Sequence, residues 1–306
     1  MAPNFVTRVA FKNILIATDF SEVSQHALLH ALRMAKRFDA KLTVVHVAPP
    51  EAQTRIPLEP VPVELDWQKK RGAQGLARLE GFEALHVFPH EMMLKQGRPW
   101  PEIRDLIEQR GIDLIALGTH GRGLIGTLLL GSAAEQVLRH ATCPVLTVGP
   151  DVLTGLLDHE RFAHILFATD FSDGSLHALP YALSLAEEND AELTLMHVLE
   201  QLEPLPAEYS KELLSDYRSR LWQLVPDEAN LWCKPQVTVA IGTAPDEIVR
   251  TARDRQVDLI VLGVHPAGAV ASHLPCTVLH SVVRTARCPV LTVRGAAYGS
   301  GRTNWG

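Results

Sequence analysis

A long internal repeat constrains this sequence more than any other feature does. The 34 residues from Ile14 to Val47 recur from Ile165 to Val198, with 20 identical positions and no gap. A second pair of matching blocks starts at Gly111 and Gln256, and both copies close with Cys-Pro-Val-Leu-Thr-Val. A repeat of this length in a chain of 306 residues predicts two domains of similar structure. We expect domains at residues 1–150 and 151–306.

Each copy alternates predicted strands with predicted helices. The short apolar run Ile14–Ala17 predicts a buried strand, and apolar residues at helical spacing after Ser24 predict a helix. Further strands are expected at 42–47, before Gln96, at 114–117 and at the closing motif, and further helices at 68–79, 102–110, after Ser132, 207–224 and 246–255. Such alternation indicates parallel sheets with helices on both faces. The predicted fold class is α/β, with two tandem open-sheet domains of five parallel strands each.

Charge and composition exclude several classes of function. Lys and Arg number 29 against 35 Asp and Glu, and the formal net charge of −6 gives no attraction to nucleic acid or anionic lipid. No apolar run approaches the roughly 18 residues that a membrane span needs. The four cysteines lack the Cys-x-x-Cys spacing of zinc sites, so we expect reduced thiols that pack in the core. A cytoplasmic protein with no nucleic-acid or membrane partner is expected.

A glycine-rich loop follows the predicted strand at 114–117. It begins Gly118-Thr119-His120-Gly121, and nine residues later Gly131-Ser132 opens the last helix of the first copy. Ligands of parallel sheets bind beyond the carboxyl ends of the strands, where glycine allows close backbone approach and a helix N-terminus attracts phosphate. Ser132 and Glu135 also match a capping box, which a helix without a ligand would have too. The spacing alone therefore leaves open whether this loop binds phosphate or only turns the chain.

The order of these motifs resembles the universal stress protein family. The resemblance rests on the opening strand with Thr-Asp-Phe-Ser, on the glycine loop after Asp-Leu-Ile, and on the closing Cys-Pro-Val-Leu. It extends over nearly the whole chain, twice. It implies an adenine-nucleotide alpha hydrolase-like fold, an intramolecular pseudo-dimer of the two repeats that also allows a homodimer, and ATP binding where the glycine signature is intact.

The resemblance also implies which residues bind the nucleotide. Those expected near adenine and ribose are Ala17, Thr18, Asp19, Val47 and Gly97. Those expected around the phosphates are Gly118, His120, Gly121, Gly131, Ser132 and Ala133. Asp19 could in addition help to hold the Mg²⁺ that accompanies ATP, since Mg²⁺ takes few carboxylates. The alternative for Asp19 is a turn residue that caps the following helix.

The second copy has lost part of the loop. Pro266 stands at the position of Gly121 and Cys276 at that of Gly131. Proline removes an N–H donor and cysteine adds a side chain where the backbone would approach a phosphate. We therefore expect one ATP site, in the first copy. The second copy could bind a nucleotide weakly, bind a ligand without a triphosphate, or serve the structure only.

The predicted function is that of an ATP-binding stress-response module whose nucleotide regulates binding to an unknown protein partner. The alternatives are a weak ATPase and a scaffold that needs no nucleotide. An enzyme is disfavoured because the chain lacks the G-x-x-x-x-G-K-[ST] loop and has no lysine in its glycine loop. His26 and His30 lie one helical turn apart and could bind a metal, but the second copy has Tyr181 in place of His30.

Overall fold

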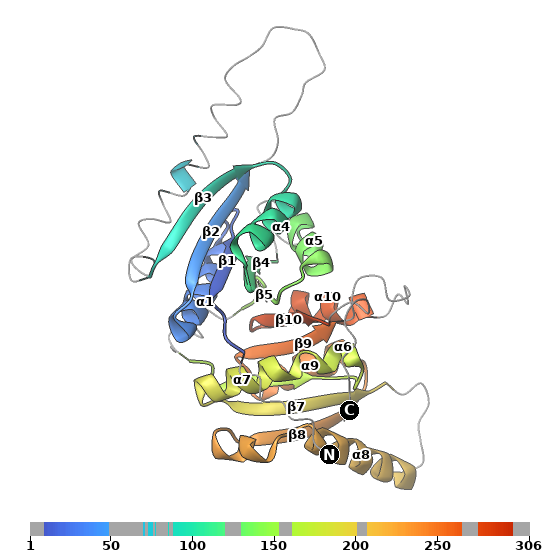
Figure 1. Cartoon of the computed structure of the whole chain (residues 1–306). Helices are drawn as coiled ribbons and strands as arrows, with labels where there is room; N and C mark the ends of the chain where they lie inside the picture. Colours follow the sequence, from blue (N-terminus) through green and yellow to red (C-terminus); the bar gives the residue numbers. More distant parts are fainter. Residues whose placement is uncertain are drawn as a thin grey trace, which may run out of the picture.

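The computed structural model of this chain describes residues 9–48, 70, 73–75, 77, 85, 88–119, 130–152, 161–200, 207–264 and 275–295. The strands of the first half are β1 (Asn13–Ala17), β2 (Lys41–Ala48), β3 (His90–Gln96), β4 (Leu114–Gly118) and β5 (Val145–Val148). Those of the second half are β6 (His164–Ala168), β7 (Glu192–Leu199), β8 (Pro235–Ile241), β9 (Leu259–Val264) and β10 (Val290–Arg294). They form one ten-stranded sheet in the order β3-β2-β1-β4-β5-β10-β9-β6-β7-β8 (Figure 1).

The two halves join through their last strands. Within each half the five strands are parallel, as predicted, whereas β5 and β10 pair antiparallel, with Leu146 opposite Leu291. The Thr147 hydroxyl, buried in this joint, donates to the carbonyl of Val290 at 3.2 Å. The strand order reads the same from either end, so the repeats are related by a pseudo-twofold axis at the joint. The pseudo-dimer is thus one continuous mixed sheet rather than two separate sheets.

Helices cover both faces of this sheet. They are α1 (Glu22–Phe38), α4 (Pro99–Arg110), α5 (Ser132–His140), α6 (Asp173–Leu176), α7 (Leu179–Asn189), α8 (Ala207–Gln223), α9 (Ala244–Asp254) and α10 (Pro275–Thr285), with a 3₁₀ turn, η2, at Asp227–Leu231. One buried cluster lies under α1, α7 and α8, and the other under α4, α5, α9 and α10 (Figure 1). Each cluster contains residues of both halves. The core therefore runs through the joint on both faces.

The helix after the first strand differs between the repeats. In the first half α1 is one helix of 17 residues, but in the second half α6 ends at Leu176 and α7 starts at Leu179. Pro180 takes the place of Leu29 there. Its ring would clash with the carbonyl four residues earlier, so the helix breaks. The prediction of one continuous helix is wrong for the second copy, and the helix predicted at 68–79 lies largely outside the described residues.

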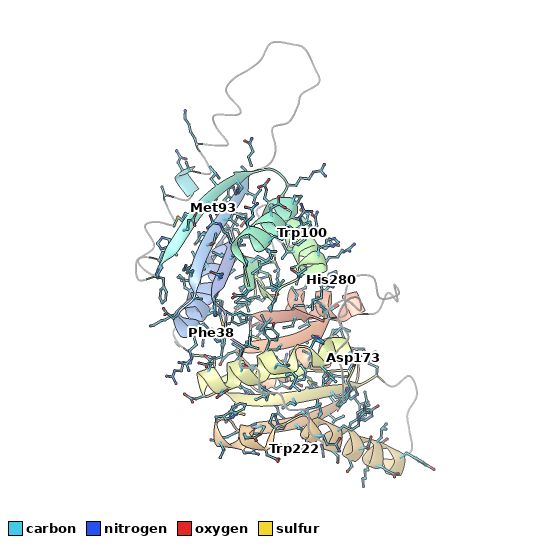
Figure 2. All side chains as sticks on the ribbon, viewed as in Figure 1. Phe38, Met93, Trp100, Asp173, Trp222 and His280 are labelled. Atoms are coloured by element: carbon cyan, nitrogen blue, oxygen red, sulfur yellow. The ribbon has the colours of Figure 1, made fainter. Side chains whose placement is uncertain are left out.

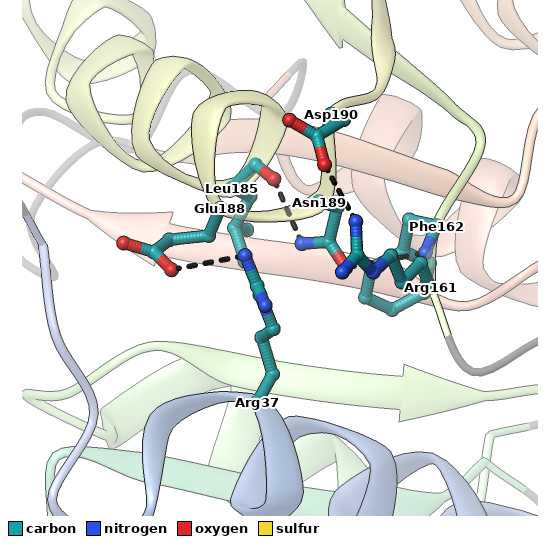
Figure 3. Close-up of polar contacts among 7 residues, drawn as sticks. All are labelled: Arg37, Arg161, Phe162, Leu185, Glu188, Asn189 and Asp190. Carbon is teal, nitrogen blue, oxygen red and sulfur yellow. Dashed lines mark hydrogen bonds and ion pairs between the residues drawn. The ribbon is translucent and has the colours of Figure 1, made fainter.

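Side chains of α1 cross to the second half. Figure 3 shows Arg37 reaching Glu188 on α7, at 3.3 Å. The Arg33 guanidinium lies 4.1 Å from the centre of the Phe162 ring. The Phe11 ring lies 6.2 Å from that of Tyr181 on α7 of the second half. Within the first half it also meets the ring of Phe38, at the end of α1 (Figure 2), edge to face at 5.2 Å. The ion pair is partly buried, and together with the cation–π and ring contacts it joins the two halves on this face of the sheet.

His30 lies on α1, one helical turn before Arg33, and is fully buried. Neither ring nitrogen has a hydrogen-bond partner among the described residues. Burial, and then the charges of Arg33 and His26, lower the pKa of His30 to about 3. An unfolded chain has a histidine pKa of about 6.5. Between these values the unfolded state binds more protons, so His30 makes the protein less stable as the pH falls.

We therefore expect His30→Leu to reduce the pH dependence of stability. Between pH 7 and pH 5 the wild type should lose about 2 kcal/mol more free energy of unfolding than the variant does. Urea denaturation at the two pH values measures the difference. His177→Gln is the control, because His177 holds the equivalent position to His26 and is exposed. An equal loss in wild type and His30→Leu would show that His30 accepts its proton in the folded state.

Candidate functional site

A cavity of about 280 Å³ opens at the carboxyl ends of β1, β2 and β4 and at the start of α5. It is close to the roughly 300–1,000 Å³ of small-molecule sites. Eight of the eleven predicted nucleotide-binding residues line it, namely Ala17, Thr18, Asp19, Val47, Gly118, Gly131, Ser132 and Ala133. Gly97 does not stand among the lining residues, and His120 and Gly121 lie outside the described residues. The structure thus brings the predicted residues of four elements to one place.

Asp19 holds the turn between β1 and α1. Its Oδ1 accepts hydrogen bonds from the backbone N–H of Ser21 at 3.0 Å and from the Ser21 hydroxyl at 2.6 Å. Ser21 is the N-cap of α1, and its Oγ accepts from the N–H of Ser24 at 3.2 Å. Asp19 therefore acts on the helix cap through Ser21 rather than as the cap itself. Its carboxylate also lines the cavity, so the structural and the binding roles are compatible.

His46 also lines the cavity, and the sequence interpretation did not place it there. Its Nδ1 lies 2.7 Å from the carbonyl of Thr18, so the N–H of this nitrogen donates to that oxygen. Its ring lies 4.4 Å from that of Phe20, whose φ of 62° is left-handed. The repeated His-Val at the end of the second predicted strand was the available signal. His46 ties the ends of β1 and β2 together at the floor of the cavity.

The first turn of α5 faces the cavity with its N–H groups. Gly131 is the N-cap, in an extended conformation with φ −61° and ψ 142°, and no side chain caps the helix. The capping box predicted from Ser132 and Glu135 is therefore wrong, because Ser132 is already the first helical residue. Glu135 instead pairs with Arg139 at 2.9 Å. The leading N–H groups of a helix have no partner within it, so this end can bind an anion.

Two of the predicted glycines, Gly118 and Gly97, have a role in the backbone of the fold. A side chain on Gly118 would bring its Cβ to 3.1 Å from the backbone N of Ser24, so glycine lets β4 pass close to the start of α1. Gly263 has the same role in the second half, with Gly174 O at 2.3 Å from the equivalent Cβ position. Gly97 has a φ of 153° in the turn before α4, where Pro99 and not Gly97 lines the cavity. Neither Gly118 nor Gly131 uses the positive φ that a glycine permits.

The second half has an equivalent but smaller cavity, of about 140 Å³. Thr169, Asp170, His197, Val198 and Gly263 line it, at the positions of Thr18, Asp19, His46, Val47 and Gly118. At three other lining positions the second cavity has the larger side chain. Met196 stands for Val45, Val278 for Ala133 and Leu279 for Ala134. Besides the lost loop glycines, these three replacements reduce the room for a ligand.

His197, which lines this second cavity, belongs to a cluster of aromatic side chains. The rings of His197 and Tyr217 stack at 4.5 Å, and the Arg220 guanidinium lies 4.3 Å from the centre of the Phe171 ring. The pKa of Asp170 lies below its usual range, because hydrogen bonds from Ser172 and Ser175 and from the backbone outweigh the burial that raises it. The turn between the first strand and the first helix is thus the same in both halves, since Asp170 accepts hydrogen bonds from Ser172 as Asp19 does from Ser21.

Metal binding depends on where His, Cys, Asp and Glu side chains come together. Within the described ranges there is no group of three or more His, Cys, Asp or Glu residues that could hold a metal ion. Asp19 is the one carboxylate among the described lining residues of the first cavity. A single carboxylate suffices where Mg²⁺ takes its other ligands from phosphate and water. The first cavity therefore fits a cation that arrives with a phosphate ligand better than a resident metal.

Comparisons with known proteins match both halves of the chain. A family model described as "Universal stress protein family" matches residues 10–149 and 161–294. A universal stress protein of Mycobacterium tuberculosis is 26% identical over 296 residues, which cover 92% of this chain and 96% of the relative. One of Methanocaldococcus jannaschii is 37% identical over 145 residues, which cover 45% of this chain and 82% of the relative.

A solved structure has the same fold. The crystal structure of a universal stress protein from Archaeoglobus fulgidus superposes with a TM-score of 0.68 at 23% identity, over 92% of this chain and 98% of that one. At this level of identity the likeness concerns the fold. Among the helices that the structure describes, none combines the length and apolar character needed to cross a membrane.

Proposed function

Because the chain belongs to the universal stress protein family, we propose that its first half binds ATP in the larger cavity and that its second half binds no triphosphate. The observation that carries the proposal is the difference between two cavities built on the same turn. The first has about 280 Å³ and an open helix N-terminus, and the second has about 140 Å³. ATP is the ligand because the intact glycine loop of the first copy resembles that of the ATP-binding subgroup.

In this proposal the base and the phosphates occupy opposite ends of the cavity. The apolar end is lined by Val45, Ile103 and Val137 and suits the adenine ring, with the backbone of Val47 at its edge. The phosphates lie against the first N–H groups of α5, beside Ser132 and Ala133. Asp19 stands where it would orient water around the Mg²⁺ of the nucleotide. The role of such a site would be regulatory, with bound nucleotide changing how the protein binds a protein partner.

Hydrolysis is the second candidate. Fast phosphoryl transfer uses a lysine or arginine to stabilise the charge that develops on the phosphates. The described residues that line the first cavity include neither. We therefore propose a nucleotide-binding protein in which turnover, if present, is slow. A scaffold without nucleotide is the remaining alternative, and the experiment below separates it.

Calorimetric titration of the purified protein with ATP and Mg²⁺ tests the proposal. We expect one tight site per chain, and ATP or ADP in the supernatant of the heat-denatured protein before any nucleotide is added. A turnover assay on the same protein then measures hydrolysis. Two equal sites would contradict the assignment of the second half, and no binding at all would favour the scaffold.

A matched pair of substitutions locates the site. Ala133→Val places in the first cavity the side chain that the second cavity has at Val278. Since the fold accepts valine there in the second half, we expect a folded protein whose ATP affinity falls by about tenfold or more, at about 1.4 kcal/mol per decade. Val278→Ala is the reverse change and should leave that affinity unchanged. Equal affinities for wild type and Ala133→Val would place the nucleotide away from α5.

A further inference from the structure

The second half reaches the end of α5 that is remote from the cavity. Arg294, the last residue of β10, donates a hydrogen bond from Nη2 to the carbonyl of Leu138. Leu138 belongs to the last turn of α5, whose carbonyls have no partners further along the helix. A residue of the second half therefore stabilises one end of the helix whose other end lines the first cavity.

The same contact is missing in the opposite direction. The counterpart of Leu138 in α10 is Val283, and the counterpart of Arg294 is Gly149. A Cβ on Gly149 would lie 3.4 Å from the carbonyl of Val283, so the backbones are arranged alike in both places. Glycine has no side chain to donate. The arginine is thus present only where it contacts the helix of the larger cavity.

We propose that Arg294 is a positioning residue for the phosphate-binding end of α5, so that the second half completes the ATP site of the first. This inference rests on the proposed function. It gives the second half, with its smaller cavity and altered loop, a role in binding by the first.

Two physical effects connect Arg294 with the other end of the helix. A cation at a helix C-terminus offsets the partial negative charge there, which otherwise repels an anion bound at the N-terminus. With nine residues at about 1.5 Å each, α5 spans only about 13 Å. A helix this short is not stable by itself, so a frayed last turn also loosens the first. Arg139 is a second cation in the same last turn, but it is largely exposed and pairs with Glu135, which offsets its charge.

The test compares ATP with adenosine in the full chain. Arg294→Ala should weaken ATP binding about fivefold to thirtyfold, equivalent to about 1–2 kcal/mol at about 1.4 kcal/mol per decade, while adenosine binding changes less than about twofold. Arg294→Lys keeps the charge and a donor and should stay closer to wild type. Arg253→Ala is the control for net charge, since Arg253 pairs with its neighbour Asp254, and it should change neither affinity. Equal weakening of ATP and adenosine, or unchanged ATP affinity, would overturn the proposal.

Hydrogen exchange separates this proposal from the proposed function. Amide exchange over 132–140 is measured in the same variants without nucleotide. Arg294→Ala should accelerate exchange in α5 and leave α4 unchanged, whether or not the wild type binds ATP. If the wild type binds no ATP, the proposed function is wrong. Unchanged exchange in α5 overturns the positioning role of Arg294 in either case.

Discussion

Gly131→Val should reduce ATP binding below detection while the protein stays folded. Gly131 has φ −61° and ψ 142°, which valine adopts readily, so the backbone can keep its course. The branched side chain would stand between the first N–H groups of α5 and the phosphates. Loss of two hydrogen bonds to a charged acceptor, each about 1.5–3 kcal/mol, weakens binding by about two to four orders of magnitude. Loss of a good N-cap residue should cost about 1 kcal/mol of stability.

Titration calorimetry measures the affinity, and circular dichroism shows whether the variant is folded. The matched control is Cys276→Val, which places the same residue at the equivalent position of the second half. It should leave ATP affinity unchanged, as should Asp170→Ala. A folded Gly131→Val protein with wild-type affinity would mean that the phosphates bind elsewhere.

Phe167→Ala should destabilise both halves together. Phe167 lies in β6 of the second half, is 0% exposed, and belongs to the buried cluster that also contains residues of β1 and α1. Truncation of a buried phenylalanine costs about 3–5 kcal/mol. Because the sheet and both clusters continue through the joint, we expect one unfolding transition with this loss.

The measurement is urea denaturation combined with hydrogen exchange of β1 in the first half. If the chain unfolds as one unit, the slowest amides of β1 should exchange about two to four orders of magnitude faster in the variant. Tyr209→Ala is the control, since Tyr209 is 68% exposed, and it should change stability by less than about 0.5 kcal/mol. Two separate transitions, or unchanged exchange in β1, would show that the halves fold independently.

The repeat made most of this fold predictable. Strands such as β1 are short apolar runs between turn residues, and helices such as α1 have apolar residues at helical spacing, so both follow from local pattern. The pairing of β5 with β10 does not. The closing apolar runs of both copies predict buried strands whether or not the two strands pair with each other. An apolar run of this kind does not specify which strand lies beside it.

The candidate site was predictable where a motif fixes a position along the chain. Residues such as Asp19 and Ser132 meet at the cavity because the carboxyl ends of parallel strands share one edge. The predicted start of α5 is wrong by one residue, because Ser-x-x-Glu is also compatible with a helix that begins one residue earlier, with Gly131 as its N-cap. The replacements by Met196 and Leu279 are visible in the alignment of the two repeats. That both side chains line the second cavity follows only from the fold, because the two residues are far apart in the sequence.

The antiparallel joint between β5 and β10 has a consequence for the history of such a chain. Two separate copies would have to meet in solution before their last strands could pair, and their association would depend on concentration. Within one chain the pairing is intramolecular, and joining two units by a short linker gives an effective concentration on the order of millimolar. Once joined, only one copy must retain the binding loop, provided that the other still supplies its strand. Fusion thus relaxes selection on half of the molecule, which is free to diverge into a support for the other.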